Sequence, residues 1–340
     1  MRNQNIKQHY VPQFYLRNFA DKNGNINVFD INRENHYKTS PRNECYEKLL
    51  YDLNPEILNR FSDNTNHYEE IVDDKIRILN EEVSSILINS LNKAISTGKG
   101  FEFISSDREI LYDFIVLQTF RTPFYRKRLN YLCFSFALRT EIDFLDEKEL
   151  LDLIHNLLLF GVVERLYNLD FKLNETYHLF FDHLIDEILS LKLQLRDSQK
   201  LFLLNKSTEK FITSNTPVNI RWKPDFLAHL KMLVTTMDKE KPILDIGNYL
   251  EFMTIHLPMS REFSIFIFNK NVDNNLNEMN QSVGIIRDYN SDLAFNLNYS
   301  TFLKSSDKVF SSTDNFDKFI EWKNNRINPF LKFEFRELNI

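Results

Sequence analysis

The stretch YHLFFDHLIDEILSLKLQLRDSQKLFLLN (Tyr177–Asn205) decides the fold class, because the pattern of its apolar residues changes along it. The first part, up to about residue 195, has the three- and four-residue spacing of a helix. The run KLFLLN (Lys200–Asn205) then reads as a short β-strand. The chain is therefore predicted to change from helix-forming to strand-forming sequence at about residue 197.

The sequence before this point predicts mainly helices. After a short strand at 26–31, apolar residues recur at helical spacing over four segments: about 68–95, from Ser105 to Pro123, 147–168 and 174–195. Only 6 glycines occur in 340 residues, which favours long helices over a barrel rich in tight turns.

The sequence after residue 197 predicts mainly strands. Short β-prone runs separated by polar turns indicate an antiparallel sheet over roughly 200–270, with helices near 273–288 and 314–326. No repeat or linker is evident, so we expect one α+β domain over residues 1–340. Its mainly helical first two thirds (helical layer about 67–196) would pack on an antiparallel sheet formed largely after residue 200 (sheet-rich part 197–340).

Composition limits the compartment and the partners. Lys and Arg number 42 against 48 Asp and Glu, so a net charge of −6 requires any nucleic-acid contact to use a local basic patch. Cys45 and Cys133 are isolated and are each expected to be a buried free thiol. The N-terminus has no signal-peptide pattern, and the most apolar stretch, Leu150–Leu166, is too polar to span a bilayer. We expect a soluble cytoplasmic protein without a membrane partner.

A first polar cluster is HYVPQFYLRNF (His9–Phe19). Pro12 suits the start of a short helix on which Gln13 and Arg17 share a face, four residues apart. His9 lies just before the free N–H groups of that helix, an arrangement that can bind an anion. The alternative is a terminal anchor, in which the aromatic residues pin the segment and the polar atoms satisfy buried backbone groups.

A second cluster is LQTFRTPFYRKR (Leu117–Arg128). Gln118 and Arg121 share a helical face, and Tyr125 follows four residues after Arg121. Pro123 should kink the helix, because it cannot donate a hydrogen bond to the carbonyl of residue 119. Arg126 begins the densest basic run, where cations and tyrosines alternate as in an RNA or phosphate groove. The alternative is a solvated basic turn near a helix end.

Motifs for metals and nucleotides are missing from the sequence. It contains no Walker A loop, no G-x-G-x-x-G, no H-E-x-x-H and no G-x-S-x-G. His178 and His183 lie five residues apart on a predicted helix, so their side chains diverge and make poor joint ligands. We expect neither a metal nor a cofactor.

Three segments together resemble a bacterial family known as a domain of unknown function. Its members share an HYVPQFYLRNF-like start, a QxxRTPxYR-like helix and an FITSDxPV-like hairpin, here His9–Phe19, Gln118–Arg126 and Phe211–Val218. In the hairpin Asn215 stands where the family has Asp; it can form the turn but cannot act as a base. The resemblance implies a component of bacterial accessory genomes, a context that often includes phage-defence effectors.

The resemblance also allows the first two segments to be joined into one site. His9, Arg17 and Arg121 would be catalytic, and Gln13, Gln118, Tyr125 and Arg126 would bind substrate. Metal-independent RNA cleavage needs a base for the 2′-hydroxyl, a role for His9, and positive charge for the phosphate, a role for Arg121 and Arg17.

Three hypotheses follow from this site. The first is a metal-independent nuclease acting on RNA, as a toxin-like or phage-defence effector. The second is a non-catalytic module that binds a phosphorylated ligand or a protein partner through the cationic pocket. The third is a scaffold in which the polar clusters fix the N-terminal segment to the kinked helix.

Overall fold

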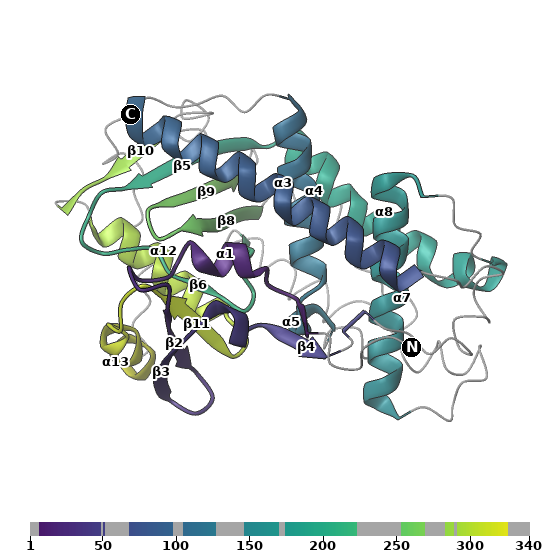
Figure 1. Cartoon of the computed structure of the whole chain (residues 1–340), viewed down its shortest axis with the longest axis horizontal. Helices are drawn as coiled ribbons and strands as arrows, with labels where there is room; N and C mark the ends of the chain where they lie inside the picture. The colour runs from purple at the N-terminus through teal and green to yellow at the C-terminus, as the bar shows by residue number, and fades with distance from the viewer. Residues whose placement is uncertain are drawn as a thin grey trace, which may run out of the picture. The chain divides into compact units, whose positions relative to one another are not determined.

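The fold is α+β, as the computed structural model shows (Figure 1). The structure describes residues 7–48, 50–51, 68–97, 105–126, 146–169, 174–222, 253–268, 283–288 and 291–325. The predicted fold class is confirmed: long helices dominate the first two thirds, and most strands follow residue 199. None of the helices within these residues is long and apolar enough to cross a membrane.

The chain divides into two compact units, each built from separated segments. The first unit comprises Met1–Pro12, Glu44–Ile86 and Ser105–Lys192. The second comprises Gln13–Asn43, Leu87–Ile104 and Leu193–Ile340. The boundary between Pro12 and Gln13 falls inside the first sequence cluster. The single domain over 1–340 stays a prediction, and each unit is described by itself.

The first unit is built mainly of helices, at the positions that the apolar spacing predicts. They are α3 (Tyr68–Thr97), α4 (Ser105–Phe120), α5 (Pro123–Arg126), α7 (Glu147–Tyr167) and α8 (Glu175–Asp197). The C-terminal ends of α3 and α8 belong to the second unit. The break between α4 and α5 confirms the interruption predicted at Pro123.

Helix α7 shows how local sequence sets the ends of a helix. Asp146 accepts from the backbone N–H of Glu149, whose side chain accepts from the N–H of Asp146, and Asn168 ends the helix in the left-handed conformation with φ 49°. Within α7, a Cβ on Gly161 would clash with Tyr177 and Ile185 of α8. Glycine therefore allows α7 and α8 to approach closely.

The described residues of the second unit form two sheets. The five-stranded sheet has the order β10-β5-β9-β8-β7, with all neighbours antiparallel except β10 and β5. Its strands are β5 (Gln199–Asn205), β7 (Asn219–Trp222), β8 (Met253–Ser260), β9 (Phe263–Phe268) and β10 (Val283–Ile286). The four-stranded sheet has the order β3-β2-β11-β6, with strands β2 (Ile26–Asp30), β3 (Asn35–Thr39), β6 (Thr213–Ser214) and β11 (Lys308–Ser311).

Two sequence predictions in this unit are wrong. Residues 283–286 form β10, parallel to β5, instead of the end of a helix over 273–288, because pairing with a neighbouring strand overrides the local pattern. Residues 273–282 of that prediction lie outside the described part. The segment Phe211–Val218 does not form the predicted hairpin either. β6 pairs with β11 and β7 pairs with β8, so the two strands belong to different sheets.

The core of the second unit is rich in aromatic rings. Phe29 of β2 stacks on Phe302 of α12 (Ser291–Lys304), and Phe295 of α12 stacks on Phe319 of α13 (Asp317–Asn325). Helix α12 contacts β6 of one sheet and β7 and β10 of the other. The sequence does not predict α12. Eight of the nine residues from Ala294 to Phe302 are buried, the exception being Asn296, so no polar face marks the segment as a helix.

Candidate functional site

A two-stranded antiparallel ribbon carries the histidine of the first sequence cluster. It pairs β1 (Lys7–His9) with β4 (Tyr46–Lys48), both in the first unit. Residues directly opposite in such a ribbon share a face. One face therefore carries a mainly cationic and aromatic set: Lys7, His9, Tyr46 and Lys48. The other carries Gln8 and Glu47.

His9 is held in one tautomer. Its Nδ1 lies 3.0 Å from the backbone oxygen of Glu44, and because a carbonyl oxygen only accepts, Nδ1 carries the hydrogen. In the neutral ring the lone pair is then on Nε2. The ring is half-buried and lies 5.6 Å from the Tyr46 ring. A partly accessible imidazole with this tautomer has the chemistry of a general base.

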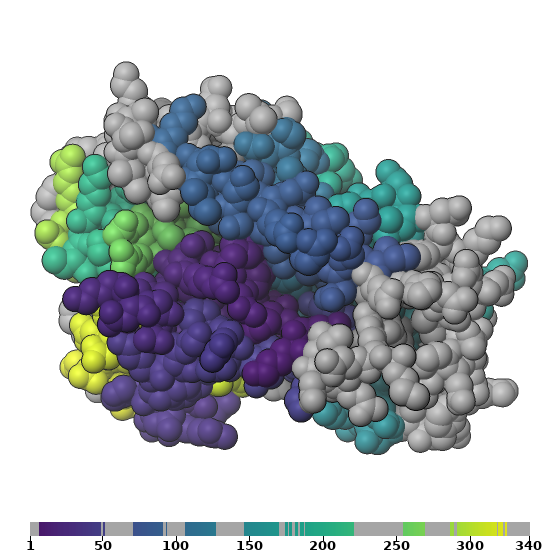
Figure 2. Space-filling view, viewed as in Figure 1, coloured from purple at the N-terminus to yellow at the C-terminus, as the bar shows by residue number. Residues whose placement is uncertain are grey.

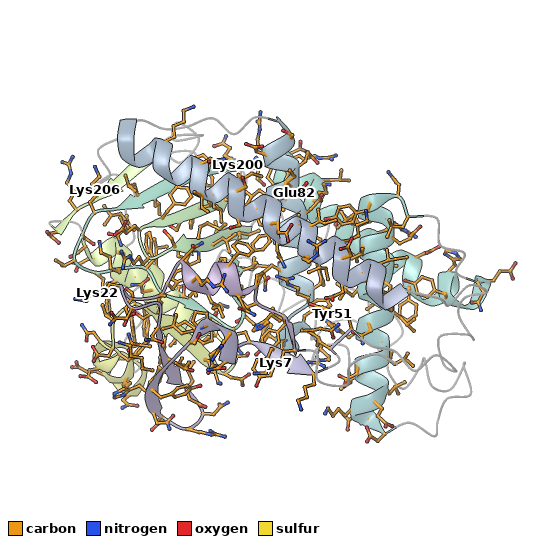
Figure 3. The ribbon with its side chains drawn as sticks, in the orientation of Figure 1. Lys7, Lys22, Tyr51, Glu82, Lys200 and Lys206 are labelled. Atoms are coloured by element: carbon orange, nitrogen blue, oxygen red, sulfur yellow. The ribbon has the colours of Figure 1, made fainter. Side chains whose placement is uncertain are left out.

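Lys7, one of the two cations of this face, lies beside its aromatic ring. Lys7 Nζ is 4.1 Å from the centroid of the Tyr46 ring. Lys7 and Lys48, which are opposite each other in the ribbon, are both exposed. Figure 3 labels Lys7, and the N-terminal segment, coloured purple, forms part of the visible surface in Figure 2. The face therefore presents positive charge to solvent.

The opposite face of the ribbon is fixed to the rest of the first unit. Gln8 is buried, and its Oε1 accepts a hydrogen bond of 2.9 Å from the backbone N–H of Tyr51. Glu47 pairs with Arg126 of α5 at 2.5 Å, and Arg126 pairs with Asp152 of α7 at 2.6 Å. Burial disfavours the Arg126 cation, but the two carboxylates outweigh it and raise its pKa above the ordinary value.

Gln118 and Arg121 hold the chain just after His9. Gln118 Nε2 donates to the Tyr10 carbonyl oxygen at 2.9 Å, and Gln118 Oε1 accepts from Arg121 Nε at 2.9 Å and from Arg121 Nη2. The Tyr51 hydroxyl interacts with the guanidinium and donates to the His9 carbonyl oxygen at 3.4 Å. The prediction that Gln118 and Arg121 share a face is confirmed.

Arg121 is buried without a carboxylate partner among the described residues. Only 2% of it is exposed, and burial lowers its pKa, although the Tyr51 hydroxyl opposes this. A side chain buried to this degree does not reach a bound nucleic acid. The geometry supports a positioning role for Arg121, acting through Gln118 and Tyr51 on the backbone that carries His9.

The break at Pro123 exposes two carbonyl groups that find other donors. The Thr119 oxygen accepts from the Thr122 hydroxyl at 3.2 Å, and the Phe120 oxygen accepts from His155 Nε2 at 2.8 Å. His155 is buried, and desolvation lowers its pKa to about 4, so the ring is neutral at pH 7. Tyr125 packs edge-on against Phe120, with ring centroids 4.2 Å apart, beside a small cavity that His155 also lines.

Gln13 and Arg17 belong to the second unit. They lie on α1 (Gln13–Arg17), where Arg17 Nη2 donates to Gln13 Oε1 at 3.1 Å, which confirms that they share a face. The buried Tyr15 hydroxyl lies 3.0 Å from Thr213 Oγ1 and also donates to the Pro258 carbonyl oxygen. Within its own unit, α1 is therefore anchored, while Arg17 is exposed.

The structure thus brings together the part of the predicted site that lies in the first unit, whereas Gln13 and Arg17 lie in the second unit and their place beside His9 stays a prediction. Gln118 and Arg121 meet the backbone of His9 and Tyr10 in the first unit. Three exposed or half-exposed residues of the ribbon were missed by the sequence analysis: Lys7, Tyr46 and Lys48. Residues 7–9 are all polar, so no alternation of apolar and polar residues marks them as a strand, and no local pattern predicts that residues 46–48 pair with them.

Among the described residues, no group of three or more His, Cys, Asp or Glu side chains is arranged to hold a metal ion. Cys45 is a buried free thiol, as predicted, and Cys133 lies outside the described residues.

The chain is similar to a known protein family over most of its length. Residues 7–315 match the model of a family described as a protein of unknown function (DUF4238). The match includes the ribbon, α4 and both sheets. Neither a curated protein nor a solved structure matches the chain.

Proposed function

The chain belongs to the DUF4238 family, and from its own residues we propose that it is a metal-independent nuclease acting on RNA. The observation that carries the proposal is the tautomer of His9, whose Nδ1–H is used by the Glu44 carbonyl oxygen. Nε2 can therefore take a proton at the face where Lys7 supplies positive charge. Of the predicted catalytic residues, His9 keeps its role, and Arg121 becomes a positioning residue.

The proposed reaction uses the 2′-hydroxyl of RNA as the nucleophile. His9 Nε2 removes the hydroxyl proton, the 2′-oxygen forms a bond to phosphorus, and the bond from phosphorus to the 5′-oxygen breaks. The 5′-oxygen takes a proton from water, and the hydroxide left behind recovers the proton from His9 Nε2, which regenerates the base. The products are a 2′,3′-cyclic phosphate and a 5′-hydroxyl end. Cations near the phosphate stabilise the additional negative charge of the transition state.

The test is cleavage of a panel of structured and unstructured RNAs by the purified full-length protein in EDTA. Wild-type protein should produce 2′,3′-cyclic phosphate ends and should leave DNA of the same sequences intact. His9→Ala should lose the activity by about 100-fold or more, the contribution of a general base. His36→Ala, which replaces an exposed histidine on β3, is the matched control and should keep it. RNA that stays intact across the panel, or full activity in a folded His9→Ala variant, contradicts the proposal.

A second function rests on the same face. The lysines and Tyr46 also suit a phosphorylated ligand that is bound and not cleaved, since both cations and the ring favour binding without any chemistry. Saturable binding of RNA with no product would support this module over the nuclease.

The proposal also includes a cellular role. A ribonuclease would act as a toxin-like or phage-defence effector in the cytoplasm, where a free buried thiol such as Cys45 is also ordinary. Induced expression in a bacterial host should then arrest growth, and His9→Ala should relieve the arrest.

A further inference from the structure

The cationic face of the β1–β4 ribbon is a local exception in an acidic chain. The protein has a net charge of −6, whereas this face carries Lys7 and Lys48 on opposite strands and no carboxylate from the ribbon itself. A local positive surface of this kind attracts phosphates through the release of their counterions. The carboxylate of Glu47, on the other face, is paired with Arg126.

A ligand can displace Lys7 from its contact with the Tyr46 ring. Its ammonium lies over the Tyr46 ring at 4.1 Å, an interaction that is weak at an exposed site. A phosphate competes well for the ammonium, because a charge-assisted hydrogen bond is stronger. When Lys7 turns to a phosphate, the face of the Tyr46 ring becomes available.

A tyrosine ring beside two cations favours single strands over duplexes. Bases in a duplex are stacked on one another, whereas an unpaired base can stack on a protein ring. Lys7 and His9 are two residues apart on one strand, a rise of about 7 Å. This matches the step between neighbouring nucleotides in an extended strand, so a phosphate on Lys7 places the next nucleotide near His9.

The ribbon is also preorganised for such a ligand. Its other face is fixed by Gln8 and by the ion pair of Glu47 with Arg126, and the chain after His9 is fixed by Gln118. A surface that is already ordered loses less conformational entropy on binding.

We infer that this face binds single-stranded RNA, with Lys7 and Lys48 on phosphates and Tyr46 stacked on an unpaired base. The inference rests on the proposed function for the choice of RNA as the ligand, and it adds the surface that binds the strand and the form of RNA that is selected.

Fluorescence anisotropy tests this inference separately from cleavage. The probes are a labelled 2′-O-methyl RNA, whose blocked 2′-oxygen cannot react, and its blunt duplex, both in EDTA. Wild-type protein should bind the single strand at least 10-fold more tightly than the duplex. Tyr46→Leu should weaken binding about 5- to 100-fold, as expected for one lost stacking contact, and Tyr46→Phe should stay within about 2-fold of wild type.

The lysines are tested by the salt dependence of the same binding. Lys7→Gln/Lys48→Gln should reduce the slope of log affinity against log salt by about 1.4, since each phosphate contact with a single strand contributes about 0.7. The control is Lys22→Gln/Lys206→Gln, which removes the same charge from two exposed lysines of the second unit (labelled in Figure 3) and should leave the slope unchanged. Circular dichroism establishes that each variant is folded.

The possible outcomes separate the two proposals. Equal loss in the control, preference for the duplex, or unchanged binding in both Tyr46→Leu and the ribbon double variant overturns the inference, even if wild-type protein cleaves RNA. Binding that depends on Tyr46 and the two lysines without any cleavage of natural RNA supports the inference and overturns the nuclease.

Discussion

The side-chain amide of Asn215 donates to Asp307 Oδ2 at 3.2 Å, while Asn215 Oδ1 accepts from the backbone N–H groups of Asp307 and Lys308, both at 3.3 Å. Asn215 Nδ2 also donates to Ser306 Oγ at 2.7 Å. An aspartate could accept from the two backbone groups, but it has no hydrogen to donate to a carboxylate. In this chain the amide therefore joins the turn after β6 to the segment before β11.

Replacing Asn215 with Asp should destabilise the second unit. The change loses two donated hydrogen bonds and sets two carboxylates against each other, so we expect a loss of about 1–3 kcal/mol in the free energy of unfolding at pH 7. The repulsion raises the pKa of the pair, and the loss should therefore shrink as the pH falls and one carboxyl is protonated. Urea denaturation at pH 7 and pH 4.5 measures both effects.

The exchange variant Asn215→Asp/Asp307→Asn is the control for this prediction. It restores one donor and one carboxylate at the pair and should recover most of the lost stability. An Asn215→Asp protein as stable as wild type at pH 7 would show that the amide hydrogens do not matter.

Removing the amide of Gln118 should affect a buried network. Gln118→Leu leaves the Tyr10 carbonyl oxygen and Arg121 Nε without their partner, and each buried group left in this way costs about 1–3 kcal/mol. In Gln118→Leu/Arg121→Met the unpaired cation is also gone, so the double variant should be more stable than the sum of the single changes. Chemical denaturation of the four proteins gives the coupling energy.

The exposed pair of α1 provides a comparison for Gln118. Gln13→Leu also removes an acceptor from an arginine, but Arg17 can turn to water, so stability should change by about 0.5 kcal/mol or less. Similar losses for Gln13→Leu and Gln118→Leu would contradict the importance assigned to burial.

His155 should make stability depend on pH. Its pKa is about 4 in the folded protein and about 6.5 when unfolded, so the unfolded chain binds more protons between these values. The stability that the neutral ring contributes is complete above pH 6.5 and is lost as the pH falls toward 4. Between pH 7 and pH 5 the loss is about 2 kcal/mol.

Thermal melts at several pH values check this. His155→Gln retains a donor for the Phe120 carbonyl oxygen but does not titrate, so its melting temperature should fall less than that of wild type between pH 7 and 5. His36→Gln, at an exposed position, should follow wild type. Parallel curves for wild type and His155→Gln would argue against a buried neutral imidazole.

Adding one methyl group at Gly161 should separate α7 from α8. The new Cβ would meet Tyr177 and Ile185, and overpacking of this kind costs about 1–3 kcal/mol. Ile185→Val in the same protein creates room and should recover part of the loss, as guanidinium denaturation would show. A Gly161→Ala protein at least as stable as wild type would mean that the helices adjust freely.

Local sequence predicted the elements better than their partners. Helices α3, α7 and α8 have clear apolar spacing or end signals such as Asp146 and Asn168, and the structure places them within about two residues of the prediction. The partners of β6 and β7 depend on residues far along the chain, which no local pattern encodes. Helix α12 has no polar face to mark it.

The candidate site was predicted only in part, because local spacing does not encode contacts between distant segments. The i, i+3 spacing of Gln118 and Arg121 correctly indicated that they share a face. That this face lies near the His9–Phe19 segment was expected only from the family motifs, and Gln118 does bond to the Tyr10 carbonyl oxygen. Burial of Arg121 was not foreseen, because arginine is rarely enclosed without a carboxylate. Tyr46 lies in none of the motifs, and only the ribbon register reveals its place beside His9.

The pairing of β2 with β11 sets an order of events during protein synthesis. Asp30 pairs with Lys308, roughly 280 residues later in the chain. At a translation rate of about 5–20 residues per second, the ribosome takes about 15–55 s to make the partner strand. Throughout that time the nascent β2–β3 segment has an open edge able to pair with other chains, so a chaperone or slow production should raise the yield of folded protein.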